Sequence, residues 1–153
     1  MKIAKIFVLT IAALAMMPVV AQDNMQILRD KIKADKKLVV AVNMGLTESE
    51  AKGFWPVYDA YQKDLQGINE RLGKLILKYA DAYNKGPVSN DTAKKLLGEM
   101  LAIEESELKL KRAYVPKLEK ALPEWKVARY LQIENKIRAI VKYELAAEVP
   151  LVE

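Results

Sequence analysis

The chain has 153 residues, a formal net charge of +5, and neither cysteine nor histidine. Without cysteine there is no disulfide, no thiol chemistry and no lipid-anchored lipoprotein. Without histidine the commonest general base and metal ligand is missing. The positive charge is too mild to indicate a nucleic-acid partner.

Residues 1–21 have the three parts of a secretory signal peptide. Two lysines open the segment, a largely apolar run comes next, and Ala21 supplies the small residue before the cut. The alternative is an uncleaved membrane anchor. It is disfavoured because the apolar run is short of the ~20 residues that span a bilayer and is broken by Pro18. We therefore expect a periplasmic protein without stable membrane insertion. Its single domain, residues 22–153, carries 23 basic and 20 acidic residues, a net charge of +3.

A first, shorter helix is expected from Asp23 to Val42, because apolar residues there keep helical spacing. They are Met25, Leu28, Ile32, Val39 and Val42. Gly45 can supply the left-handed residue that comes after a helix end. The lysines of this segment form either a solvated face or a contact surface for acidic partners. They are Lys31, Lys33, Lys36 and Lys37.

The strongest pattern in the chain predicts a long helix from Glu48 to about Asn84. Thr47 can cap its start, and Glu50 can close a capping box with Thr47. At ~1.5 Å per residue the helix is roughly 55 Å long, so it must lie against a partner helix. Its apolar seam keeps heptad spacing and consists of Phe54, Tyr58, Tyr61, Leu65, Ile68, Leu72, Leu75 and Tyr79.

The next helix is predicted from a cap at Ser89 or Asn90 to about Leu122. Its expected seam consists of Leu97, Leu101, Leu108, Val115, Leu118 and Leu122, with Glu104 and Lys111 at two further positions. Glu104 and Glu105 are adjacent and therefore diverge around the helix, so we interpret them as solvated charges and not as a catalytic pair.

If the helix predicted after Gly86 folds back on the helix predicted before it, Pro56 lies opposite Pro116. Each proline lies inside its helix, where it removes a hydrogen bond and crowds the previous turn. Breaks at one level favour a hairpin that bends as a unit. The alternative is two unrelated prolines that are each tolerated.

The last helix is expected from Pro123, at its first position, to near Ala147. Its predicted buried stripe consists of Tyr130, Ile133, Ile137, Ile140 and Val141. No segment alternates long enough to be a strand. The predicted fold is all-α: a long bent antiparallel helical hairpin flanked by a shorter N-terminal helix and a C-terminal helix.

The segment Leu46-Thr47-Glu48-Ser49-Glu50 resembles the LTxxQ motif of the Spy/CpxP-like periplasmic proteins, with Glu in place of Gln. A second copy of the motif would fall at Leu122-Pro123-Glu124-Trp125-Lys126, where both Thr and Gln are replaced. The phrase Phe54-Trp55-Pro56-Val57-Tyr58 also looks like the residues just after the motif in many exported bacterial proteins. The chain is thus similar to this family in layout, as a divergent member.

The resemblance implies a bent helical hairpin, commonly an antiparallel dimer, that binds unfolded proteins without ATP or signals envelope stress. Some relatives bind zinc, nickel or cobalt, largely through histidines. This chain has none, and scattered carboxylates favour hard cations, so no metal and no cofactor is expected.

Three functions remain. The first is a chaperone-like or envelope-stress adaptor protein that binds unfolded or partner proteins. The second is a secreted coiled-coil structural or complex subunit with no client. The third, an enzyme, is the poorest because no catalytic constellation is present. The stretch from Lys109 to Arg129, with seven basic and two acidic residues, favours the first.

A hairpin with apolar stripes on both arms cannot bury them all, so we expect a two-fold homodimer with antiparallel arms. The residues expected on the partner-binding side are Tyr58, Tyr61, Lys111, Arg112, Tyr114, Lys117 and Arg129.

Overall fold

The computed structural model describes residues 34–152, and this part of the chain contains four helices and no strand. A helix over residues 34–44 is followed by α3 (Glu48–Tyr83), α4 (Asn90–Glu119) and α5 (Glu124–Glu148). The all-α prediction is therefore confirmed. The expected signal peptide, the first part of the expected N-terminal helix, and Lys31 and Lys33 lie outside the described residues.

Local chemistry accounts for where the long helices begin and end. The capping box is present at the start of α3: Glu50 N–H donates to Thr47 Oγ1 at 3.3 Å, and Thr47 N–H donates to Glu50 Oε2 at 2.7 Å. Gly86 turns the chain with a φ of 122°, a value that favours glycine. Ser89 then caps α4 by accepting the Thr92 N–H.

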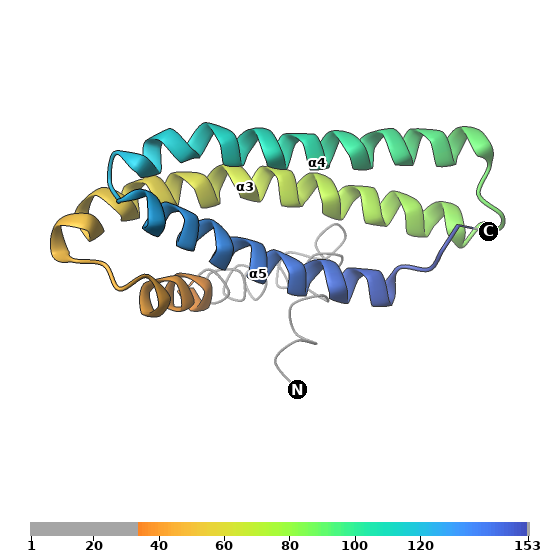
Figure 1. Ribbon diagram of the computed structural model, residues 1–153. Helices are drawn as coiled ribbons and strands as arrows, with labels where there is room; N and C mark the ends of the chain where they lie inside the picture. The colour runs from red at the N-terminus through yellow and green to blue at the C-terminus, as the bar shows by residue number, and fades with distance from the viewer. Residues whose placement is uncertain (1–33, 153) are drawn as a thin grey trace, which may run out of the picture.

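The helices α3 and α4 form the long antiparallel hairpin and lie side by side along their length (Figure 1). Both continue through their prolines, Pro56 and Pro116. The two prolines lie at nearly the same level, because Gly53 faces Ala121 on one side of them and the Tyr61 and Tyr114 rings meet on the other. Figure 1 shows both helices curving toward α5 at this end.

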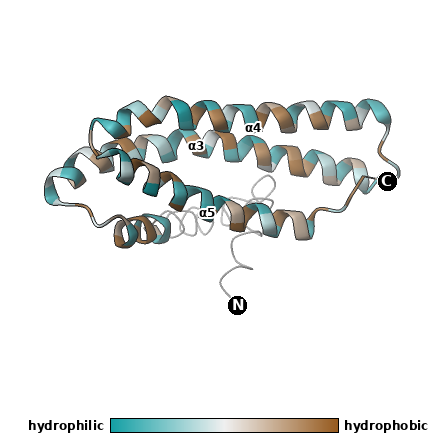
Figure 2. Cartoon of the chain, in the orientation of Figure 1, coloured by the Kyte–Doolittle hydropathy of each residue, from teal (hydrophilic) through white to brown (hydrophobic). Residues whose placement is uncertain are grey.

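The main core lies at the proline end, where α3 starts, α4 ends and α5 starts. Its aromatic rings meet edge to face: the Phe54 and Tyr130 centroids are 5.1 Å apart, and those of Tyr61 and Tyr114 are 5.3 Å apart. The buried members are Val40, Met44, Phe54, Tyr58, Tyr61, Leu65, Tyr114, Leu118, Leu122, Val127 and Tyr130. Figure 2 shows apolar and polar residues alternating along α3 and α4, as amphipathic helices require.

The predicted seam of α4 was wrong over most of the helix. Leu97, Leu101 and Leu108 are 60%, 56% and 48% exposed. Leu118 and Leu122 are buried as expected. From residue 96 to residue 114 the covered face lies one residue earlier in the heptad, and its buried or half-buried members are Leu96, Met100, Ile103, Glu107, Leu110 and Tyr114. The sequence pattern favoured leucines over a stripe that contains the acid Glu107.

Two smaller stripes also differ from expectation. In the first helix Val40 and Met44 are buried while Val39 and Val42 are exposed. This rotation places Val40 and Met44 in the core and pairs Lys36 with Glu134 on α5 and Lys37 with Asp59 on α3. Lys36 is therefore not part of a solvated face.

In α5 Tyr130 is fully buried as predicted, but Ile140 is 57% exposed. Ile133, Ile137 and Val141 are half-buried. Pro123 is the residue before the first turn, and Glu124 takes the first helical position that was expected for the proline.

Candidate protein-binding surface

The two motif-like segments meet in space. Lys126 Nζ, from the fifth position of the second segment, donates to Glu50 Oε2, from the fifth position of the first, at 2.6 Å. It also donates to the Gly45 carbonyl at 2.8 Å. The hydrogen bond from Lys126, and after it the one from the Thr47 N–H, lowers the pKa of Glu50 below its ordinary value. The glutamate in the first segment thus caps α3 and binds α5 at once.

The three tyrosines expected on the partner-binding side lie in the core of the chain's own fold. Tyr58, Tyr61 and Tyr114 are only 3%, 1% and 4% exposed. Burial raises the pKa of Tyr114 to about 12, with a further contribution from Asp64, which accepts the Tyr114 hydroxyl at 2.6 Å. The three tyrosines are therefore not on the open surface where a second copy or a client was expected: Tyr130 of α5 packs against Tyr58 and Tyr61, and Tyr61 packs against Tyr114.

The four basic residues assigned to the same side do not gather on one face. Lys111 is bound to Glu107 at 3.1 Å, and the Lys117 Nζ lies 3.9 Å from the centroid of the Tyr114 ring. Arg112 is exposed, but the step of five residues from it to Lys117 turns the two to different sides of α4 at ~100° per residue.

Arg129, the fourth of these basic residues, lies on α5. It donates to the Asn43 carbonyl at 2.7 Å and so fixes the first described helix. The expected basic side is therefore dispersed, and Arg112 is the member that stays next to exposed leucines.

The apolar surface that remains open on α4 is the α4 leucine row, defined as Leu97, Leu101 and Leu108. All three side chains are about half exposed or more. Their spacing of four and seven residues keeps them on one side of the helix. Glu104 and Glu105 lie between Leu101 and Leu108, and Lys111 and Arg112 come after Leu108. Exposed apolar residues with mixed charges around them are typical of a protein-binding surface.

A buried polar group at the middle of the molecule joins three helices. Arg138 of α5 donates to Glu107 of α4 through Nε at 3.0 Å and donates to Asn69 of α3. The Glu107 and Arg138 side chains are only 8% and 14% exposed. Burial alone would raise the pKa of Glu107, but the charge and hydrogen bonds of Arg138, together with Lys111, lower it.

A second group of this kind lies nearer the proline end. Glu134 of α5 accepts from Lys36 Nζ at 2.8 Å and from the Gln62 side-chain amide at 2.8 Å. The same amide also donates to the Tyr130 hydroxyl at 3.2 Å. In the described part of the chain, no buried side-chain polar atom lacks a hydrogen-bond partner. These ties fix α5 on the hairpin at defined positions.

Sequence reasoning missed Glu107, Lys126 and Arg138. One sequence signal could have identified Glu107 as buried: it lies at heptad spacing from Ile103 and Tyr114 and so on the same side of α4. A charged residue at such a position indicates a charged partner from another helix. That partner, Arg138, is 31 residues away, and no local pattern identifies it.

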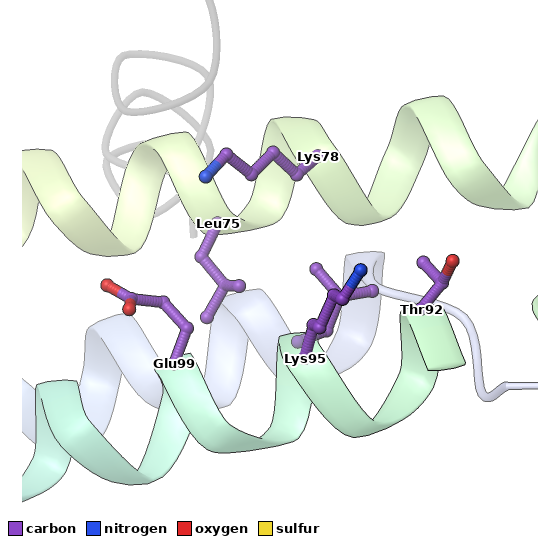
Figure 3. A pocket seen from close by; sticks show the side chains of 6 residues that line it. Leu75, Lys78, Thr92, Lys95 and Glu99 are labelled. Atoms are coloured by element: carbon purple, nitrogen blue, oxygen red, sulfur yellow. The ribbon is translucent and has the colours of Figure 1, made fainter. Parts of the chain in front are cut away.

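A depression of about 330 Å³ lies between α3 and α4 near their turn, lined by Leu75, Lys78, Thr92, Lys95, Leu96 and Glu99. Figure 3 shows Leu75, one of the lining side chains, reaching from α3 toward α4. Glu99 of this lining accepts a hydrogen bond from Arg71 at 3.0 Å.

Metal-binding and membrane-spanning features are absent from residues 34–152. This range contains no group of three side chains suited to hold a metal ion. None of its helices is long and apolar enough to cross a membrane.

Comparisons with protein-family models, with curated proteins and with solved structures find no match to this chain.

Proposed function

We propose that this protein is an exported, ATP-independent binding protein of the chaperone-like or envelope-stress adaptor type. The observation that carries the proposal is the α4 leucine row, which stays exposed although the aromatic core at the proline end and the buried polar groups described above are covered within the chain's own fold. Three leucines beside charged residues provide modest apolar area, which suits weak and reversible contacts with unfolded segments.

The meeting of the two motif-like segments adds support. In the resembled family each motif ends in glutamine, whereas here the two final residues are Glu50 and Lys126 and form an ion pair. This ion pair joins the two motif-like segments. This agrees with a divergent member of the Spy/CpxP-like family, and with the fold and binding role that the resemblance implies.

An aggregation-suppression assay tests the proposal. The purified protein should lower the light scattering of a chemically denatured client during refolding. Leu101→Ser combined with Leu108→Ser should remove most of that protection. The matched control is Leu38→Ser, because Leu38 is a leucine of similar exposure, 63%, on another helix. Equal loss in both variants would show that the α4 leucine row is not the binding surface.

The alternative is a secreted coiled-coil structural or complex subunit, for which the same row would bind one fixed partner. Such a protein gives no protection to unrelated clients in the same assay. Absence of protection by the unsubstituted protein would therefore favour this second function.

A second copy of the chain is the other partner that we propose for the row. Acids at 104 and 105 and bases at 111 and 112 flank Leu108 at nearly equal distances. Two α4 helices that run antiparallel about an axis near Leu108 set each acidic pair level with the basic pair of the other copy, whereas parallel helices set like charges together. Within the single chain Glu105 pairs with Lys109 and Glu104 with Lys142. Both ion pairs are exposed, so replacing them by pairs with the second copy costs little free energy.

Charge exchange tests this homodimer. Glu104→Arg alone and Arg112→Glu alone should each be monomeric by sedimentation equilibrium, since residues 104 and 112 face each other across the axis and each substitution sets like charges there. An equimolar mixture should dimerise, because opposite charges then meet at both places. A mixture that stays monomeric would refute the antiparallel pairing. Glu104→Arg also leaves the leucines intact, so it separates self-association from client protection.

A further inference from the structure

The two halves of α5 are attached to the hairpin by different means. The first half contributes Val127 and Tyr130 to the core, at 4% and 0% exposure. Beyond Glu134 no described residue of α5 is fully buried. We name residues 135–148 the α5 cover.

Polar contacts hold the α5 cover in place. The buried one is Arg138, which binds Glu107 of α4 and Asn69 of α3. The others are near the surface: Asn135 accepts from Lys111 at 3.1 Å, and Lys142 lies 3.7 Å from Glu104. Just after the cover in the sequence, the Pro150 carbonyl accepts a hydrogen bond from the Tyr79 hydroxyl at 2.9 Å.

Loss of a single partner would undo the buried contact. A buried ion pair contributes little net stability when it is intact, but removing one partner leaves the other charged and poorly solvated. Arg138, left without Glu107, regains its hydration only if the helix that carries it moves out toward water. The core residues of the first half do not oppose that movement, because they lie on the other side of Glu134.

The α5 cover also borders the α4 leucine row. Glu104, which contacts Lys142, lies between Leu101 and Leu108. Opening of the cover would bare the apolar side chains Ile137, Val141 and Leu145, which are half-buried when it is closed. It would also bare the seam between α3 and α4 at Asn69 and Glu107.

We infer that residues 135–148 form a releasable cover, locked by the contact of Arg138 with Glu107 and Asn69. The cover opens while the hairpin and the first half of α5 stay folded, and it thereby enlarges the apolar surface beside the α4 leucine row. The enlargement of a binding surface rests on the proposed function, whereas the opening itself does not.

Hydrogen exchange measured peptide by peptide on the purified protein tests the opening. Glu107→Gln should raise exchange in peptides from residues 135–148 by at least about tenfold, since it leaves Arg138 without its charged partner. Peptides from the rest of α3 and α4 should change little. The matched control is Glu104→Gln, the same substitution at the exposed contact to the cover, for which little change is expected anywhere. Equal acceleration in cover and hairpin, or none in the cover, would overturn the inference.

A second variant tests the lock even if Glu107→Gln unfolds the whole chain. Glu107→Leu combined with Arg138→Leu replaces the ion pair by apolar packing and should return cover exchange to that of the unsubstituted protein or below it. Faster cover exchange in this double variant would mean that the ion pair is not the lock. Client protection is measured on the same set: an open cover that leaves protection unchanged overturns the role in binding and leaves the opening intact.

Discussion

Gly53 of α3 lies close to Ala121 at the end of α4, and its replacement by alanine tests this packing directly. A Cβ at residue 53 would lie 2.9 Å from the Cβ of Ala121 and 3.4 Å from its Cα. Carbon atoms ordinarily approach to ~3.5–4.0 Å. Since the Ala121 Cβ is fixed to the backbone, it cannot swing away, so one chain segment must shift.

The change in the free energy of unfolding caused by Gly53→Ala is the sum of two opposing contributions. Alanine in place of glycine inside a helix gains ~0.8–1.0 kcal/mol. Overpacking a closed contact costs ~1–3 kcal/mol. Gly67 lies in the same helix, and a Cβ at residue 67 would meet nothing within 4 Å, so it supplies the control without the second term. Gly67→Ala should therefore stabilise the protein by ~1 kcal/mol, and Gly53→Ala should fall below that value by ~1–3 kcal/mol.

Urea unfolding followed by circular dichroism measures both variants. Ala121→Gly removes the methyl that Gly53→Ala would meet, so in that background the two glycine substitutions should have the same effect. A Gly53→Ala protein as stable as Gly67→Ala, with Ala121 unchanged, would refute the close contact and with it the alignment of α3 and α4 at the proline end.

Three further predictions address the cap, the tyrosines and export. Thr47→Ala should destabilise the protein by ~0.5–2 kcal/mol, because the first turn of α3 loses an acceptor; an unchanged urea midpoint would contradict this. Burial raises the pKa of Tyr114 to about 12 from an ordinary value of 10, and it also raises that of Tyr130. The folded state therefore binds more protons than the unfolded state above pH 10, and stability should fall as pH rises beyond that value. Unfolding and tyrosinate absorbance should rise together in an alkaline titration, and ionisation without unfolding would argue against the buried rings. N-terminal sequencing of the exported protein should begin at Gln22, and a retained Met1 would count against the signal peptide.

Helix positions were readable from the sequence because local chemistry sets them. The capping box of Thr47 and Glu50, the left-handed turn at Gly86 and the cap at Ser89 each depend on residues within one turn of chain. The level of the two prolines was readable as well, since equal counts of residues on either side of a tight turn bring them opposite each other.

The rotation of α4 was decided by the tertiary structure. A leucine pattern predicts that Leu101 and Leu108 face inward, yet Glu107 takes the inner position because Arg138 neutralises it there. Tyr58 and Tyr61 of α3 are buried for a related reason: Tyr130 of α5 packs against both rings. Both outcomes depend on contacts between residues far apart in the chain. A side chain's own hydrophobicity cannot report whether such a partner will arrive, so the burial of Glu107 and the exposure of the leucines emerge only when three helices are packed together.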